Sequence, residues 1–216
     1  EPAVVRRAGY DKLLTRVTPS VAHLGVYIGL KGTAEELGLP KTNLWIYPGN
    51  DYDTATERFF NDRNAPFPVV YISFPSAKDP DYARRRPGTS TIEIVAPAPY
   101  EWFDQWKDQP WGKRGDDYDA FKTGLGERLM AYLYDKLPQL EGKVDYYEVS
   151  TPLSSAHFCE WQRGELYGLD HDPQRFREDW LSPRTEIRGL WLTGQDVVSC
   201  GVVGAMMAGM LTATAI

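Results

Sequence analysis

The sequence predicts an α/β fold of the α+β kind, in which helices flank a mixed β-sheet and a last strand and helix complete the chain. Three observations predict it. Short apolar or alternating segments recur through the first hundred residues, with turn residues between them. The segment 116–137 repeats its apolar residues at spacings of three and four. From Gly189 onward, a short apolar run is followed by an apolar helix rich in small residues.

Five segments have the composition of β-strands, and most are bounded by proline, glycine or asparagine. They are 22–30, 43–47, 69–74, 90–96 and 144–149. The first of them carries glycines at 25 and 29, which indicate a bulge or a close approach of another backbone. Because turn signals separate the first four segments, we expect the sheet to be at least partly antiparallel.

Helical patterns lie between and after these strands. Shorter ones cover 54–61, 79–85 and 100–108, and the longest covers 116–137, which Pro138 ends. Thr151 is placed to cap a further short helix with Pro152 at its first position. Residues 160–187 are polar and rich in Gly, Asp and Arg, so a long loop is expected there.

Composition narrows the class of protein. The chain has 216 residues, of which 42% are hydrophobic and 25% charged, which is typical of a folded protein. The net charge of -6 argues against a nucleic-acid partner, which would require a basic face. Neither Cys159 nor Cys200 stands in a metal-ligand spacing, and only three histidines are present, so no metal site is predicted.

Membrane insertion is not expected of this segment. The apolar run at 201–216 is shorter than the roughly 20 residues that a spanning helix needs. No charged-then-apolar leader follows Glu1, so no signal peptide is predicted and the chain is expected to be an excerpt. A cytoplasmic or membrane-peripheral location follows, and peripheral contact would suit a lipid-soluble substrate.

The segment 189–196 carries the strongest chemical signal. A short apolar strand is followed by Gly194 and Asp196, and the first residues of the helix from Gly201 have small side chains. Small residues let backbone N–H groups approach a ligand, and a helix N-terminus favours phosphate or an electron-rich carbonyl oxygen. A carboxylate at the strand end can accept hydrogen bonds from sugar or ribityl hydroxyls. The alternative is that these glycines only permit tight packing.

Residues 189–196, together with 200–205, closely resemble the C-terminal flavin motif of the phytoene desaturase, carotenoid isomerase and retinol saturase group. A second stretch resembles the segment before that motif in the same group, and it consists of 151–154, Arg163-Gly164, Tyr167-Gly168 and 170–172. The resemblance implies an FAD-dependent oxidoreductase that moves hydride to or from an apolar polyene. Desaturation, saturation and flavin-assisted isomerisation all fit, with NAD(P) as a candidate electron partner.

The same resemblance implies roles for individual residues. Asp196 would bind a ribityl hydroxyl of FAD, or lie near its pyrophosphate through water, and the N–H groups of Val202 and Val203 would lie near the flavin ring. The glycines would permit close approach of the backbone to the cofactor. The residues assigned to the cofactor are Gly194, Gln195, Asp196, Gly201, Val202, Val203 and Gly204.

The family's N-terminal glycine fingerprint is missing from this sequence. Gly124-Leu125-Gly126 lacks the third glycine and follows no strand. We therefore expect a substrate-binding domain at 1–187 and a C-terminal FAD-binding segment at 188–216. The dinucleotide-binding half would be absent, and the chain alone would not hold FAD tightly.

No side chain can be named as a catalytic acid or base. His171 is expected to order its loop, with a role as base as the alternative, and Cys200 is expected to be a small residue chosen for fit. Trp102, Trp106 and Trp111 either pack on a helix face or line an apolar tunnel. A rival interpretation is a non-catalytic domain that binds apolar ligands or a protein partner and retains the flavoprotein fold.

Overall fold

The computed structural model describes residues 2–216, which form two compact units. Unit 2 is Ala22–Glu160, and unit 1 combines Trp161–Ile216 with the residues that precede Ala22. The functional boundary expected between 187 and 188 concerns ligand binding, so this division does not test it, and it stays a prediction.

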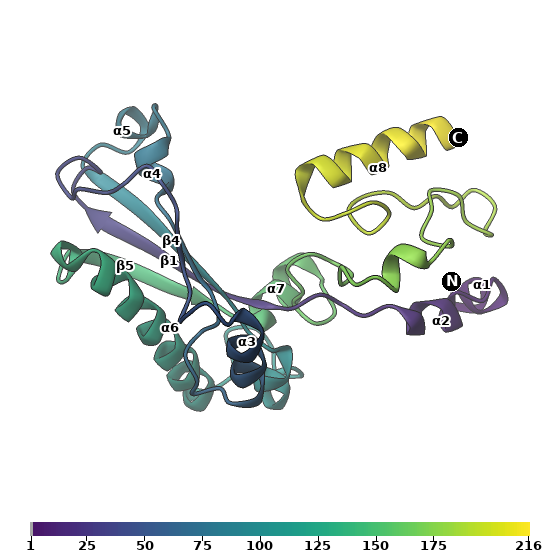
Figure 1. Cartoon of the computed structure of the whole chain (residues 1–216), viewed down its shortest axis with the longest axis horizontal. Helices are drawn as coiled ribbons and strands as arrows, with labels where there is room; N and C mark the ends of the chain where they lie inside the picture. Colours follow the sequence, from purple (N-terminus) through teal and green to yellow (C-terminus); the bar gives the residue numbers. More distant parts are fainter. Residues whose placement is uncertain (1) are drawn as a thin grey trace. The chain divides into compact units, whose positions relative to one another are not determined.

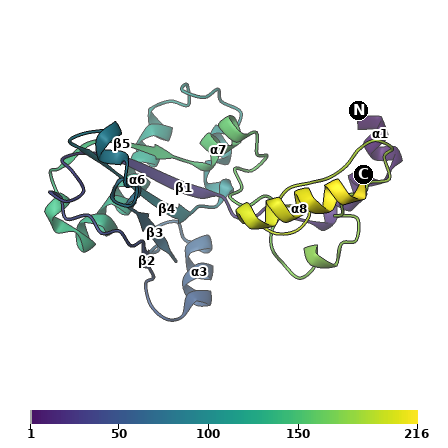
Figure 2. The ribbon, with the colours of Figure 1, turned by 90° about the horizontal axis from the view of Figure 1, so that it is seen from above.

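Unit 2 is built on one five-stranded sheet with the order β2-β3-β4-β1-β5 (Figure 2). All five predicted strands are confirmed: β1 His23–Lys31, β2 Leu44–Ile46, β3 Val70–Ser73, β4 Thr89–Pro97 and β5 Val144–Ser150. The predicted mixed sheet is wrong, because every neighbouring pair is antiparallel. β4 and β5 run in the same direction, but β1 lies between them, so they do not pair.

The two faces of the sheet differ in burial. Along β1, the residues at even positions, such as Leu24, Val26 and Ile28, are at most 2% exposed. They form one apolar cluster with residues of helix α6, Asp116–Lys136, among them Leu129 and Leu133. Figure 1 shows α6 running alongside the sheet. Fully burying each such side chain stabilises the fold by about 1.5–3 kcal/mol. Alternation of burial therefore fixes which face of the sheet α6 covers.

The remaining helices of unit 2 are short. They are α3 Tyr52–Asn61, α4 Pro75–Lys78, α5 Tyr82–Arg85, the 3₁₀ helices η2 Tyr100–Trp106 and η3 Pro138–Leu140, and α7 Pro152–Cys159. The Asp51 side chain accepts from the Thr54 N–H at the start of α3. At α7 the predicted cap is confirmed, with the Thr151 N–H donating to the Ser154 hydroxyl at 3.1 Å.

Two of the three grouped tryptophans pack inside unit 2. The Trp106 indole N–H donates to Asp117 at 2.9 Å, and the Trp102 ring lies 4.9 Å from that of Phe59. Trp111 is half exposed, with its ring stacked on His157. Packing is therefore confirmed as the role of Trp102 and Trp106.

Unit 1 contains helices α1 Pro2–Arg7, α2 Tyr10–Leu13 and α8 Gly201–Ala215, with 3₁₀ turns η1 Leu14–Arg16 and η4 Arg175–Arg177. The C-terminal helix is confirmed. The strand predicted at 189–194 is wrong, because only Trp191 pairs, in a single bridge with Arg184. A β-strand needs a neighbouring strand with which its backbone forms a ladder of hydrogen bonds. The described residues of unit 1 provide no such strand beside this segment.

The glycines of α6 provide a test of packing between helix and sheet. A Cβ on Gly126 would lie 2.5 Å from Cγ2 of Val149 on β5, whereas one on Gly124 would meet nothing within 4 Å. We expect Gly126→Ala to lower the free energy of unfolding by about 1–3 kcal/mol through overpacking. Gly124→Ala, the control, should raise it by up to about 1 kcal/mol because alanine favours helix. Urea unfolding followed by circular dichroism measures both, and equal effects would contradict the packing.

Candidate functional site

The loop before α8 is ordered by Asp196. Its Oδ1 accepts the Leu169 N–H at 2.9 Å, which ties the segment 194–200 to the polar loop at 160–187. Gly168 has a φ of 70°, and a Cβ there would lie 2.3 Å from the same oxygen. The close approach of the two segments therefore requires glycine at 168.

Arg175 is a buried cation beside this loop. Arg175 is only 4% exposed, and its Nη2 donates a hydrogen bond to the Gln195 carbonyl oxygen at 2.8 Å. Nη1 is buried and finds no acceptor, and among residues 2–216 no carboxylate lies within 4.0 Å of this guanidinium. A buried charge without a counter-ion is unfavourable, so the position favours an electron-rich or anionic partner.

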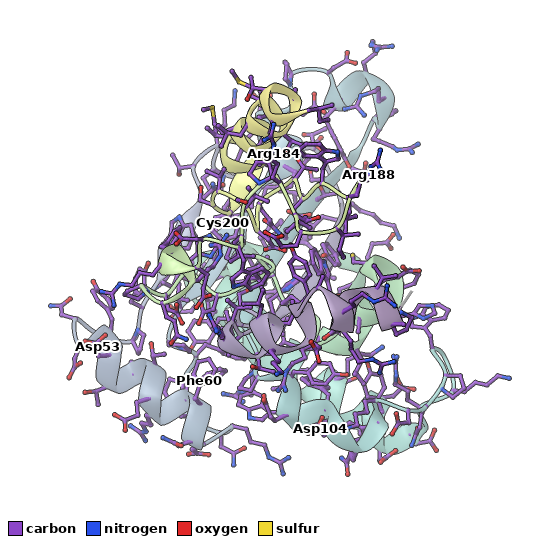
Figure 3. The ribbon with its side chains drawn as sticks, turned by 90° about the vertical axis from the view of Figure 1, so that its right-hand side faces the viewer. Asp53, Phe60, Asp104, Arg184, Arg188 and Cys200 are labelled. Carbon is purple, nitrogen blue, oxygen red and sulfur yellow. The ribbon has the colours of Figure 1, made fainter. Side chains whose placement is uncertain are left out.

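His171 orders the start of α8. Its Nε2 accepts the Cys200 N–H at 2.8 Å, which requires the imidazole to be unprotonated on that nitrogen. Figure 3 shows Cys200 where the loop meets α8. The expected loop-ordering role of His171 is confirmed, because its side chain joins its loop to the backbone of Cys200. Cys200 is exposed and forms no disulfide with a described residue, and it is the N-cap residue of α8.

The first turn of α8 combines open space with free donors. Gly201 has a φ of 89°, and a Cβ on it would meet nothing within 4 Å. Val202 and Val203 are 77% and 74% exposed. The first N–H groups of a helix have no acceptor within the helix. Gly204 differs, because a Cβ there would lie 2.0 Å from the Ser199 carbonyl oxygen, so this glycine permits packing of the loop on the helix.

These residues fit the cofactor that the sequence motif implies. The first-turn amides of α8 and the unpartnered Nη1 of Arg175 are donors suited to an electron-rich or anionic group. Gly194, with a φ of 96°, leaves open space above the loop. Oδ2 of Asp196 accepts no hydrogen bond from any described residue, so it can accept one from a hydroxyl group.

An apolar groove of about 340 Å³ adjoins the loop within unit 1. Tyr10 of α2 is buried there, its ring 5.9 Å from that of Trp180, and its hydroxyl accepts the Glu186 N–H at 3.3 Å. Leu192 and Asp196 line the same groove. The lining is mostly apolar, and the Asp196 carboxylate is one of its few polar groups. Such a groove suits a ligand with a flat apolar part.

A second groove lies on the uncovered face of the sheet in unit 2 and has a volume of about 330 Å³. Gly29 of β1 forms part of its lining, with Tyr27, Glu93 and Tyr146 around it and Pro75 of α4 at its border. The sequence patterns did not predict this surface. Gly25, Tyr27 and Gly29 occupy every second position of β1 and therefore share one face of the sheet. Two glycines on either side of a tyrosine on that face could have predicted the groove.

Tyr27 is a hydrogen-bond donor at neutral pH. Burial raises the pKa of its hydroxyl above the ordinary value, and the charges of Glu93 and Cys159 add to the effect. The ring lies over Gly25, where a Cβ would come within 3.1 Å of the phenol oxygen. On the neighbouring strand β5, Glu148 accepts the hydroxyl of Tyr146, two residues away, at 2.7 Å.

Residues 2–216 contain no group of three or more side chains suited to hold a metal ion. In the same residues, no helix combines the length and the apolar character needed to cross a membrane.

The contact between Gly168 and Asp196 is testable. Gly168→Ala should destabilise unit 1 by more than the roughly 1–2 kcal/mol of left-handed strain, because its Cβ also meets Oδ1. Gly189→Ala is the control, since Gly189 has a φ of 80° and open space. When Asp196 is also replaced by alanine, the destabilisation caused by Gly168→Ala should fall. Hydrogen exchange of the amides of α8 measures the stability of unit 1 in both backgrounds, and the same destabilisation in each would contradict this geometry.

Comparison with known proteins finds close relatives. All-trans-retinol 13,14-reductase of Rattus norvegicus is 39% identical over 212 residues, which cover 95% of this chain and 35% of that protein. The Homo sapiens protein of the same name is 39% identical over 215 residues, 96% of this chain and 35% of its own length. A Danio rerio protein named inactive all-trans-retinol 13,14-reductase is 30% identical over 217 residues.

The chain thus spans about a third of the length of these relatives. No family model matches it. Similarity over nearly the whole chain nevertheless agrees with the resemblance that residues 151–205 carry. The chain therefore belongs to the retinol saturase family.

Proposed function

We propose that this chain is the C-terminal part of an FAD-dependent oxidoreductase that reduces a carbon–carbon double bond of an apolar polyene. The observation that carries the proposal is the convergence of the motif residues on one loop. The first turn of α8 follows that loop directly, and Arg175, whose Nη1 has no acceptor, donates through Nη2 to the Gln195 carbonyl within it. The names of the relatives support reduction over desaturation or isomerisation.

When bound, the flavin would supply the hydride, and the protein would supply orientation and electrostatics. In the proposal, Arg175 and the amides of Val202 and Val203 donate to electron-rich groups of the cofactor. Asp196 accepts from a ribityl hydroxyl through Oδ2, while Oδ1 keeps the Leu169 amide. Gly194 and Gly201 leave room for this approach.

The uncovered face of the sheet is proposed to bind the substrate. A polyene is flat and apolar, and Gly29 with the rings of Tyr27 and Tyr146 offers it a flat, largely apolar surface. The protonated Tyr27 hydroxyl and Glu93 could orient a polar end group. This assignment keeps the substrate in the part before residue 187 and the motif's cofactor contacts after it, with Arg175 of the preceding loop as an additional donor to the cofactor.

The remaining partners also belong to the proposal. Because the relatives are about three times longer, we propose that the remaining sequence completes the FAD site and that this chain alone binds FAD weakly. Peripheral contact with a membrane would give access to a lipid-soluble substrate. The comparisons give no support to NAD(P), and it is not part of the proposal.

A second candidate function has one observation in its favour. The relative that is named inactive is similar over 95% of this chain, so overall similarity does not separate enzymes from proteins that lost the activity. In that alternative, the fold binds an apolar ligand or a partner without turnover.

The first test is spectroscopic. We expect the protein expressed from its whole reading frame to show flavin absorbance and to reduce all-trans-retinol when the flavin is reduced. The chain of 216 residues alone should retain little flavin, because it supplies only part of the site. Flavin without turnover would favour the second candidate, and absence of flavin after purification with added FAD would refute the cofactor assignment.

The substrate surface has its own test. Gly29→Val should fill the groove without strain, since a Cβ at 29 lies 3.8 Å from its nearest atom, and valine favours strands. In the full-length protein we expect the rate at low retinol to fall at least about tenfold, which corresponds to about 1.4 kcal/mol, with unchanged flavin absorbance. Gly49→Val, at an open turn outside the groove, is the control. Unchanged turnover in both variants would place the substrate elsewhere.

A further inference from the structure

Arg114 is a second buried cation, and it lies in unit 2. It precedes Gly115, the N-cap of α6, and is only 7% exposed. Its guanidinium carbon lies 5.2 Å from the centre of the Tyr118 ring. Nη2 donates to the Leu153 carbonyl oxygen at 3.4 Å, a long and weak hydrogen bond.

Most N–H donors of this guanidinium have no hydrogen-bond acceptor among the described residues. Arginine carries five N–H donors, and the Leu153 oxygen is the only acceptor that Arg114 finds among the described residues. Its Nε is buried without any partner. No carboxylate of residues 2–216 lies within 4.0 Å of it. Burying a charge in this way is unfavourable unless an anion joins it.

A polar cavity of about 220 Å³ opens beside Arg114. Lys122 and the Ser154 hydroxyl line it, and the loop residues Trp111 and Gly112 form a further part of the wall. This volume corresponds to about seven water molecules, because each takes about 30 Å³ in the liquid. The cavity therefore suits a small ligand and not a polyene.

Two carboxylates also line the cavity, and both have other partners. Asp119 pairs with Lys122 at 3.6 Å, and Glu148 accepts the Tyr146 hydroxyl at 2.7 Å. Neither neutralises Arg114. The net charge of -6 would not draw an anion to the protein as a whole, so any anion bound here is held by this local arrangement.

We infer that this cavity binds a small oxyanion, of the carboxylate or phosphate class, through the guanidinium of Arg114. Such groups match the planar fork of arginine with two parallel hydrogen bonds. Lys122, which is paired with Asp119 at 3.6 Å, also lines the cavity, and Ser154 adds a hydroxyl donor. The inference does not depend on the proposed function, because Arg114, Lys122 and Ser154 line neither the loop before α8 nor the Gly29 groove.

The test uses inorganic phosphate and acetate as probes at constant ionic strength. Isothermal titration and the ¹H–¹⁵N signal of the Trp111 indole are recorded on the chain of 216 residues and on the protein from its whole reading frame. We expect saturable binding of at least one oxyanion to both, with a shift of the Trp111 signal. Binding to the shorter chain alone would show that a carboxylate of the remaining sequence fills the cavity, and would overturn the inference.

Variants identify the residue responsible. Arg114→Met should weaken phosphate binding at least about tenfold, and Arg114→Lys should restore part of it. Arg128→Met is the matched control, because Arg128 already donates to the carbonyl oxygens of Arg63 and Ala65. If Arg114→Met does not fold, Lys122→Met should still weaken binding at least about threefold. Equal binding by the Lys122 variant and the Arg128 control would overturn the inference.

Discussion

One-sided burial of the antiparallel sheet is the constraint on which unit 2 depends. Side chains at alternate positions of a strand point to opposite faces, so a sheet covered on one face sorts its residues by parity. Leu24, Val26 and Ile28 take the face that α6 covers, and Gly25, Tyr27 and Gly29 fall on the other. The groove on the uncovered face is thus a consequence of how the core is built. A shift of one residue in register would bury tyrosine and expose leucine.

Unit 1 is held together differently, by polar side chains that bind backbone groups. Asp196 accepts the Leu169 amide, Arg175 donates to the Gln195 carbonyl, and His171 accepts the Cys200 amide. At the other end of α8, Arg184 donates to the Ala215 carbonyl, and Figure 3 shows it beside that helix. Such bonds need specific donors and acceptors at fixed places, and this explains why an irregular segment can hold a defined shape without a ladder.

The strands of unit 2 could be predicted from the sequence because a period of two is a local property. The order of strands is not local, and the placement of β1 between β4 and β5 is what made the expected mixed sheet wrong. The strand at 189–194 failed for a related reason, since pairing depends on a neighbour that composition does not reveal. The buried positions of Arg114 and Arg175 were also missed. An arginine in a polar stretch has the sequence signature of a solvated residue, and only tertiary packing buries it.

The glycines of the terminal motif show why packing and ligand binding were hard to separate in the sequence. At Gly168 and Gly204, an added Cβ would strike another part of the same chain, so these positions need glycine for the fold itself. Gly194 and Gly201 have positive φ and open space around them, so the fold needs their backbone conformation but leaves their surroundings empty. Both interpretations therefore apply, at different residues. A ligand in the loop would meet the second pair, while the first pair brings the loop and α8 close enough to form the site.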